Sequence, residues 1–268
     1  MRNQRVAFAG AQGDELRALL SLPDEGAPAA YALFAHCFTC SKDLKAVVNI
    51  SRALTHQGIG VLRFDFTGLG ESEGDFADTT FSSNIQDLVA AAEYMGREFE
   101  APAILVGHSL GGAAVLQATH LIDSARAVAT IGAPFDPEHV THLFEDAIGE
   151  IQAEGEAEVT LGGRSFTLSR EFVDDLATHK MERSIGTLGR PLMVFHSPVD
   201  RTVGIQNAAL IYKAARHPKS FVSLDDADHL LLDESDSGYV GTVLGAWASR
   251  YVDVRQVSGR PTAESSPR

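Results

Sequence analysis

Residues 107–112 read Gly-His-Ser-Leu-Gly-Gly and place Ser109 between glycines, directly after the apolar run at residues 103–106. A serine hydroxyl becomes an effective nucleophile only when it is held exposed beside a base. A sharp turn from a strand into a helix would hold it in this way, and such a turn favours flanking residues without side chains. The pattern therefore predicts a nucleophile elbow with Ser109 as the nucleophile.

Two residues further along the chain supply the partners that a nucleophilic serine needs. Asp200 follows the apolar run at residues 192–195, and His229 follows the acidic stretch at residues 225–228. His229 would accept the proton of Ser109, and Asp200 would fix the tautomer of the imidazole and stabilise its charged form. The order Ser, Asp, His also differs from the orders of the chymotrypsin and subtilisin types.

Other ionisable residues near these positions leave alternatives open. Three histidines at the elbow or at predicted strand ends could reach the site or make structural hydrogen bonds: His36, His108 and His196. Three aspartates just before His229 could compete with Asp200 for the acid role: Asp225, Asp226 and Asp228. The two glycines in residues 65–72 indicate a tight turn, and no lysine follows at P-loop spacing, so phosphate binding there is a weak alternative.

Acyl transfer also needs two backbone N–H groups that point at the developing oxyanion. One is assigned to Leu110, the residue after the nucleophile, at the start of the predicted helix. The second is expected from the loop at residues 36–38 and is assigned to Phe38. Removing one such donor typically raises the barrier by about 3 kcal/mol, so the backbone of this loop matters as much as any side chain.

The only two cysteines, Cys37 and Cys40, lie on either side of Phe38. Two cysteines exclude a disulfide-stapled secreted fold, and one pair cannot complete a four-ligand zinc site unless histidines are recruited. A redox role is open, and we hypothesise that oxidation of the pair distorts the loop and lowers activity. The alternative is two buried, unreactive cysteines.

The elements that position these residues follow from the hydrophobic pattern. Six runs are almost continuously apolar, which is typical of parallel strands buried on both faces: residues 31–35, 60–64, 103–106, 127–131, 192–195 and 220–224. Residues 6–9 and 16–22 predict an antiparallel hairpin at the sheet edge. Apolar stripes predict intervening helices at residues 44–54, 85–99 after a Ser82-Ser83 start, 110–121 and 239–251.

The alternation of strands and helices breaks in residues 136–189, which we interpret as a cap insertion. An amphipathic helix is expected at residues 140–151, a hairpin at 159–168 and a helix at 170–177. The cap would lie over the strand ends and line the acyl pocket; the alternative is a second core layer without substrate contact. We expect one domain at residues 1–252 and a linker-like or disordered tail at 253–268.

Composition narrows the range of partners. The 268 residues carry a formal net charge of −14 without a basic cluster, which disfavours nucleic acid and anionic membranes. No apolar stretch is long enough to span a membrane, and the N-terminus does not resemble a signal peptide, so a cytoplasmic protein is expected. No metal and no organic cofactor is required. The expected partner is a small-molecule ester, and the oligomeric state is open.

Four stretches together resemble a known family: residues 36–43, 63–72, 107–112 and 217–221 leading to His229. They are similar to the hydrolase module of bacterial α/β-hydrolase/OsmC-type fusion proteins and, more distantly, to serine-aminopeptidase-like hydrolases. The resemblance covers about residues 6–251. It implies an α/β-hydrolase fold, esterase-like activity, a triad of Ser109, Asp200 and His229, and oxyanion donors at Phe38 and Leu110.

Two features depart from that family. Many relatives have glycine after the loop histidine, where this chain has Cys37, and this narrows the conformations open to the loop. The OsmC-type domain of the fusions does not follow, so the chain is either a stand-alone relative or a module.

Taken together, these observations predict a serine carboxylesterase for short-to-medium acyl esters that works through an acyl-enzyme, with acyltransferase side activity if the cap excludes water. Two alternatives remain: a peptidase or amidase with the same triad, and a non-catalytic binding module. A haloalkane dehalogenase is disfavoured because it needs a carboxylate at the elbow, where this chain has Ser109.

Overall fold

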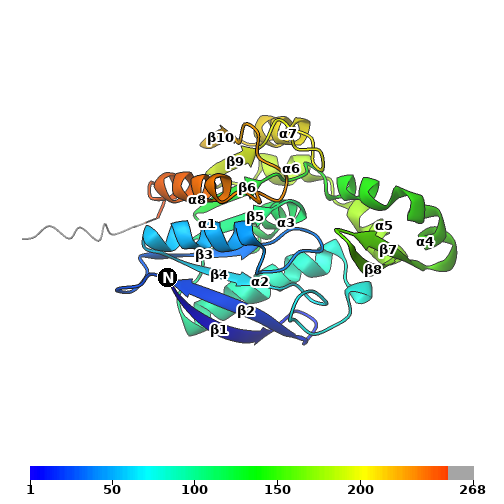
Figure 1. The fold of residues 1–268 in the computed structure, drawn as a ribbon, viewed down its shortest axis with the longest axis horizontal. Coiled ribbons are helices and arrows are strands. Elements are labelled where there is room, and N and C mark those ends of the chain that lie inside the picture. Colours follow the sequence, from blue (N-terminus) through cyan, green and yellow to red (C-terminus); the bar gives the residue numbers. More distant parts are fainter. Residues whose placement is uncertain (253–268) are drawn as a thin grey trace, which may run out of the picture.

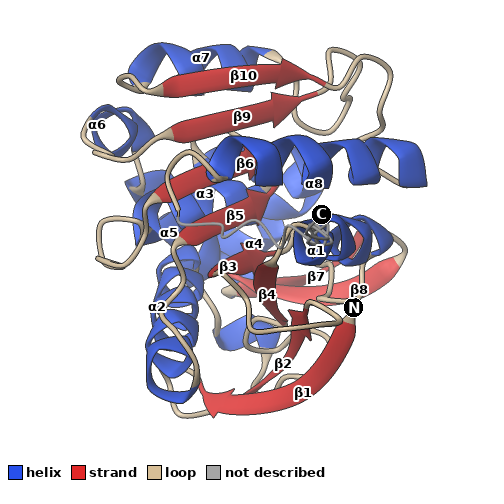
Figure 2. Cartoon of the chain, turned by 90° about the vertical axis from the view of Figure 1, so that its left-hand side faces the viewer, coloured by secondary structure: helices blue, strands red, loops and turns tan. Residues whose placement is uncertain are grey.

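The computed structural model of the chain describes residues 1–252, which form a central sheet with helices on both faces (Figures 1 and 2). The eight strands lie in the order β1-β2-β4-β3-β5-β6-β9-β10. Adjacent strands from β4 onward in this order are parallel, whereas β1 pairs with β2, and β2 with β4, in antiparallel register. The strands are β1 (Arg2–Ala9), β2 (Glu15–Leu22), β3 (Ala30–Ala35), β4 (Ile59–Phe64), β5 (Ile104–His108), β6 (Ala127–Ile131), β9 (Leu192–His196) and β10 (Lys219–Ser223).

Both faces of the sheet are covered, which explains why the inner strands are apolar without alternation. All residues of β4, β5, β6 and β9 are buried. Helices α1 (Lys45–His56) and α8 (Glu234–Ala248) pack together on one face. Helices α2 (Phe81–Glu98), α3 (Leu110–Ala118) and α7 (Gln206–Ala214) cover the other, where the larger apolar cluster lies. The α/β-hydrolase fold expected from the sequence is confirmed, including its N-terminal antiparallel hairpin.

Between β6 and β9 the chain leaves the sheet, and this segment, residues 136–189, is called the insertion below. It contains the 3₁₀ segment η2 (Pro137–Ala147), α4 (Ile148–Glu154), the hairpin β7 (Glu156–Leu161) and β8 (Arg164–Ser169), α5 (Arg170–Thr178) and α6 (Met181–Gly186). It projects to the right of the sheet in Figure 1. Its side chain Asp175 ties it to the start of α2, because both the N–H and the hydroxyl of Ser82 donate to that carboxylate at 2.7 Å.

Several details differ from the sequence-based expectation. The single helix expected at residues 140–151 is wrong, because the chain forms a 3₁₀ segment up to Ala147 before α4 begins. Phe144 also leaves the helical region (φ −142°, ψ 31°) and buries its ring, which kinks η2. Helix α2 begins at Phe81 rather than at the serine pair, since Thr80 is the cap and forms a capping box with Ser83. The short elements η1 (Phe76–Asp78), α6 and α7 were not predicted, because so few turns give little periodicity.

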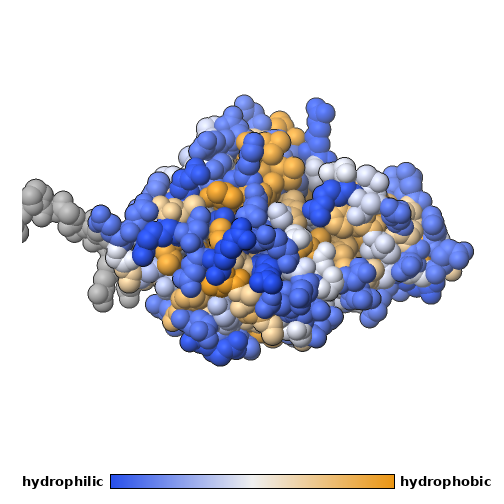
Figure 3. All heavy atoms as spheres, turned by 60° about the horizontal axis from the view of Figure 1, so that its bottom comes forward, coloured by the Kyte–Doolittle hydropathy of each residue, from blue (hydrophilic) through white to orange (hydrophobic). Residues whose placement is uncertain are grey.

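The described surface is mainly hydrophilic, with separate apolar patches on the face shown in Figure 3. The large exposed apolar side chains are scattered over many elements rather than gathered on one: Leu121, Leu143, Val199, Leu210, Phe221, Leu232 and Tyr239. Scattered single apolar residues of this kind are normal on a protein surface. None of the helices within residues 1–252 combines the length and the apolar character needed to cross a bilayer. The tail at residues 253–268 lies outside the described residues.

Candidate active site

Ser109 occupies a strained turn between β5 and α3. Its backbone angles are φ 55° and ψ −127°, a conformation that a residue with a side chain rarely adopts. The turn is possible because its neighbours are glycines. A Cβ at Gly107 would lie 2.2 Å from the carbonyl oxygen of Gly111, and a Cβ at Gly111 would lie 2.3 Å from that of His36. Larger residues at these two positions would push the elbow out of shape.

The structure brings the three predicted side chains into one chain of hydrogen bonds. The Oγ of Ser109 lies 3.0 Å from Nε2 of His229, and Nδ1 of the same ring lies 2.7 Å from Oδ2 of Asp200. These residues follow β5, β9 and β10, whose carboxyl ends meet at one edge of the parallel sheet. The arrangement suits Nδ1–H donating to the carboxylate and Nε2 accepting the serine proton.

Asp200 is held as a charged acceptor. Its other oxygen, Oδ1, accepts the backbone N–H groups of Thr202 at 2.8 Å and Val203 at 2.9 Å. Burial alone would raise the pKa of Asp200, but the hydrogen bond from His229 and these two N–H donors outweigh burial and lower it below the ordinary value. The carboxylate therefore stays ionised beside the imidazole at neutral pH.

The competing residues have other partners. The ring of His36 bonds to the carbonyl of Cys37 at 2.8 Å, and the ring of His196 to that of Val203 at 2.7 Å. Burial lowers the pKa of both rings. Of the aspartates before His229, Asp228 accepts the N–H of Leu232. No hydrogen bond joins any of these aspartates to the His229 ring in the described residues.

His108 makes a structural hydrogen bond, one of the two alternatives left open for it, with a partner that the sequence does not indicate. Its Nε2 lies 2.7 Å from the carbonyl oxygen of His229. The elbow therefore contacts His229 twice, because His108 bonds to its backbone and Ser109 bonds to its ring. Burial, followed by the proximity of His229, lowers the pKa of His108 to about 3. The ring is therefore neutral and serves as a hydrogen-bond donor.

This depressed pKa predicts an acid-sensitive fold. Below pH about 6.5 the unfolded chain gains a proton at His108 that the folded chain does not bind until pH about 3. The stability that the neutral ring provides is thus complete above pH 6.5 and falls with decreasing pH by about 1.4 kcal/mol per pH unit. Urea unfolding between pH 7 and pH 4.5 should show a shallower decline for His108→Gln.

The matched control is His56→Gln, since His56 is exposed at the end of α1. This variant should follow the wild-type pH profile. An unchanged profile for the His108 variant would contradict the assignment.

Phe38 and Leu110, the expected oxyanion donors, line a common pocket. No protein group within residues 1–252 accepts a hydrogen bond from either backbone N–H, so both remain available. The ring of Phe38 stacks on that of Phe172 from the insertion, with centroids 5.4 Å apart and planes 14° apart. The insertion therefore contacts the loop that carries the second donor.

Cys37 and Cys40 are joined by a disulfide, with Cα atoms 5.3 Å apart, so the alternative of two buried, unreactive cysteines does not describe this structure. The bond closes the turn around Phe38, where the N–H of Cys40 also donates to the carbonyl of Cys37. The cross-linked loop still leaves the N–H of Phe38 free of protein acceptors in the described chain. The effect of oxidation on turnover stays a prediction.

Asp65 anchors the other side of this loop. Its carboxylate is fully buried and accepts both the backbone N–H and the ammonium of Lys42 at 2.7 Å, and the N–H of Glu71 at 2.9 Å. The phosphate alternative for residues 65–72 is not supported, because N–H groups of this turn already donate to protein acceptors: those of Gly68, Leu69, Glu71 and Ser72. Asp65 instead fixes the end of the loop that begins at His36. In the sequence, the only indication of the contact between Asp65 and Lys42 is that an isolated lysine follows the two cysteines of the loop.

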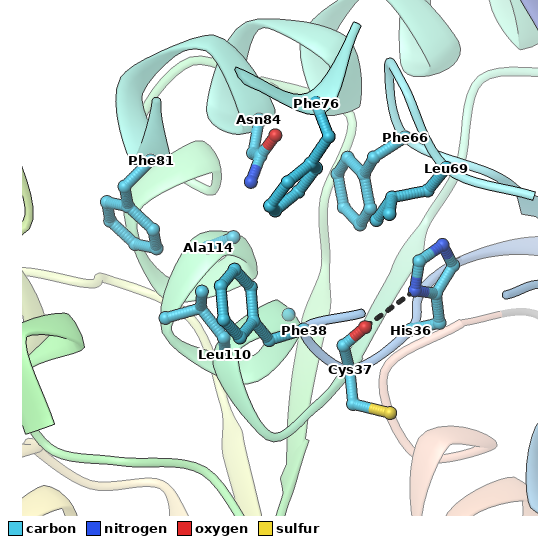
Figure 4. Close-up of a pocket in the computed structure, with 11 residues that line it drawn as sticks. His36, Cys37, Phe38, Phe66, Leu69, Phe76, Phe81, Asn84, Leu110 and Ala114 are labelled. Atoms are coloured by element: carbon cyan, nitrogen blue, oxygen red, sulfur yellow. Dashed lines mark hydrogen bonds between the residues drawn. The ribbon is translucent and has the colours of Figure 1, made fainter. Parts of the chain in front are cut away.

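Beside the oxyanion loop lies a narrow, mainly apolar pocket with a cavity volume of about 10 Å³, room for about one water molecule (Figure 4). The loop, the turn after β4, η1, α2 and the first turns of α3 form its walls. Four aromatic side chains line it: Phe38, Phe66, Phe76 and Phe81. Asn84 is the one amide side chain among the lining residues.

Comparisons with known proteins bear on the family and the fold. The model of the alpha/beta hydrolase family matches residues 32–242. The chain belongs to the alpha/beta hydrolase family. The match runs from β3 into α8 and includes the elbow, Asp200 and His229.

Two solved structures are similar to this chain over most of its length. The crystal structure of the esterase domain from a Rhodothermus marinus protein is 51% identical, with a TM-score of 0.77, and the match covers 94% of this chain and 99% of that one. Est1E from Butyrivibrio proteoclasticus, solved with ferulic acid, is 20% identical with a TM-score of 0.75 over 92% and 99% of the two chains, and shows a shared fold.

A curated relative is more distant. The mitochondrial palmitoyl-protein thioesterase ABHD10 of Mus musculus is 26% identical over 199 residues, which is 71% of this chain. The chain spans about 65% of that relative's length. The esterase domain and the thioesterase ABHD10 are named for ester and thioester chemistry, and Est1E was solved with ferulic acid. These names and this ligand describe those proteins.

Proposed function

We propose that this protein is a serine carboxylesterase that forms an acyl-enzyme on Ser109. The observation that carries the proposal is the hydrogen-bond chain from Ser109 through His229 to Asp200, with links of 3.0 and 2.7 Å. A hydroxyl, an imidazole and a carboxylate in this order form a nucleophile, a base and an orienting group. The 51% identity with a protein described as an esterase domain favours esters over amides.

In the proposed first half-reaction, Ser109 Oγ forms a bond to the ester carbonyl carbon as Nε2 of His229 takes the hydroxyl proton. The oxyanion accepts the N–H groups of Phe38 and Leu110, and the resulting imidazolium is stabilised by Asp200. Collapse of the tetrahedral intermediate breaks the bond to the alcohol oxygen, which takes the proton from Nε2. The alcohol then leaves and the acyl group remains on Ser109.

In the second half-reaction, water attacks the acyl-enzyme with His229 as base, and the acid is released as Oγ regains its proton. An alcohol that replaces water at this step would give a new ester, which is the proposed acyltransferase side activity. The apolar side chains beside the proposed donors support an apolar acyl group, and the small cavity there, about 10 Å³, favours short chains over long ones.

The test combines covalent labelling with a substrate panel. A fluorophosphonate should add to the wild-type chain at Ser109, with one adduct located by peptide mass spectrometry. The enzyme should hydrolyse 4-nitrophenyl acetate and butanoate faster than aminoacyl anilides. Faster anilide cleavage would support the peptidase alternative, and a chain that neither labels nor turns over esters would be the non-catalytic binding module.

A further inference from the structure

The ring of His36 holds the peptide group that carries the proposed oxyanion donor of the loop. Its Nδ1 lies 2.8 Å from the carbonyl oxygen of Cys37, and Figure 4 shows this bond as a dashed line. The ring is 1% exposed, and burial lowers its pKa, so it is neutral and has a single N–H. Two bare acceptors would repel each other at this distance, so the hydrogen lies on Nδ1 and is donated to Cys37.

The direction of this carbonyl sets the direction of the Phe38 N–H. The peptide bond between Cys37 and Phe38 is trans, and the C=O and N–H of a trans peptide lie in one plane and point in opposite directions. A rotation that turned the carbonyl away from His36 would turn the N–H of Phe38 with it. The bond from His36 therefore fixes the orientation of the donor, although the ring lies on the opposite side of the peptide from the oxyanion.

The turn at residues 37–40 is strained and therefore depends on such support. Thr39 has φ 63°, a left-handed conformation that a β-branched residue rarely adopts. The carbonyl of Cys37 also accepts the N–H of Cys40 at 3.1 Å, and a disulfide joins the same two residues. Both of these links lie within the turn and would rotate with it. The bond from His36 instead ties the turn to a buried ring that directly follows β3.

We propose that His36 is a positioning residue that aims the N–H of Phe38 at the oxyanion during ester hydrolysis. The inference rests on the proposed esterase function and adds a residue to its mechanism. His36 acts through the carbonyl of Cys37 and not on the substrate itself. Without its N–H the peptide is free to rotate, and the donor points at the oxyanion for only part of the time. Because the oxyanion exists only in the transition state and the tetrahedral intermediate, the loss falls on kcat and leaves KM almost unchanged.

The experiment compares two variants of equal side-chain size that differ in the hydrogen-bond donor. In His36→Asn the amide NH₂ can take the place of Nδ1, because both are bonded to Cγ, whereas His36→Leu puts a methyl group there. With 4-nitrophenyl butanoate, His36→Leu should lose about 10- to 100-fold in kcat, less than the loss of a whole donor, with KM within about twofold of the wild-type value. His36→Asn should recover most of this loss.

Two further measurements distinguish positioning from a merely structural role. A trifluoromethyl ketone forms a tetrahedral oxyanion on Ser109, so its Kd should rise in His36→Leu by about the factor that is lost in kcat/KM. A general loss of stability would not produce this match, and circular dichroism should show that both variants are folded. His120→Gln is the matched control, because the ring of His120 also bonds to a backbone carbonyl, that of Ser184, beyond the C-terminal end of α3. This variant should keep the wild-type kcat.

The outcomes are distinguishable. An unchanged kcat in His36→Leu would overturn the role of His36 and leave the esterase proposal standing. Equal losses in His36→Leu and His36→Asn would also overturn it, because they would follow from the lost ring and not from the lost N–H. The same readouts in His36→Ala decide the case if the leucine variant does not fold. A wild-type enzyme that hydrolyses no 4-nitrophenyl ester and is not labelled at Ser109 would overturn both proposals.

Discussion

Replacing Ser109 by alanine is expected to lower kcat for 4-nitrophenyl butanoate by about 10⁴- to 10⁶-fold, the range seen when the nucleophile of such a unit is removed. No other hydroxyl lies at hydrogen-bond distance from Nε2 of His229 within residues 1–252. The remaining rate above water would come from the two N–H donors and the pocket alone. Steady-state rates and fluorophosphonate labelling of both proteins provide the measurement.

The substitution removes only the hydroxyl and keeps the Cβ at a strained backbone position, where φ is 55°. Alanine has the same difficulty there as serine, so the melting temperature should change little, and an unfolded variant would be recognised by circular dichroism. Ester hydrolysis at more than a hundredth of the wild-type rate in folded Ser109→Ala would sink the proposed mechanism.

Replacing Asp200 by asparagine is expected to lower kcat by about 10⁴-fold while the protein remains folded. The backbone N–H groups of Thr202 and Val203 can still bond to the amide oxygen. The NH₂ group then faces Nδ1 of His229 and favours the tautomer with its proton on Nε2. That nitrogen can no longer accept the proton of Ser109, and the imidazolium loses its counter-charge.

Asp228→Asn is the matched control, because this neighbour of His229 also carries a carboxylate that accepts a backbone N–H, that of Leu232. Its asparagine variant should stay within a few-fold of the wild-type kcat. Similar losses for both variants would mean that charge near the site matters in general and that Asp200 has no special role.

The main sheet and the three converging side chains could be predicted because their signals are local. Apolar runs marked the strands, and Ser109, Asp200 and His229 each follow such a run directly or within a short loop. Once the strands are parallel, their carboxyl ends must share an edge, so residues distant in sequence meet without any knowledge of packing.

The remaining features depend on contacts between residues that are distant in the sequence, and a local pattern cannot predict such contacts. The contact from His108 to the carbonyl of His229 joins residues 121 positions apart. The burial of Asp65 against Lys42 and the unpaired amide of Asn84 likewise exist only after β4, α2 and the loop are packed together. The break at Phe144 has the same origin, because burial of its ring outweighs the helical periodicity of its neighbours.

The stacking of Phe38 on Phe172 has a consequence for engineering. Phe172 belongs to the insertion, and Phe38 belongs to the loop beside Ser109. A chimaera that exchanges residues 136–189 for those of another enzyme would therefore alter the geometry of the hydrolytic centre unless the donor supplies an aromatic surface for Phe38. The insertion and the loop that carries Phe38 must therefore be exchanged together.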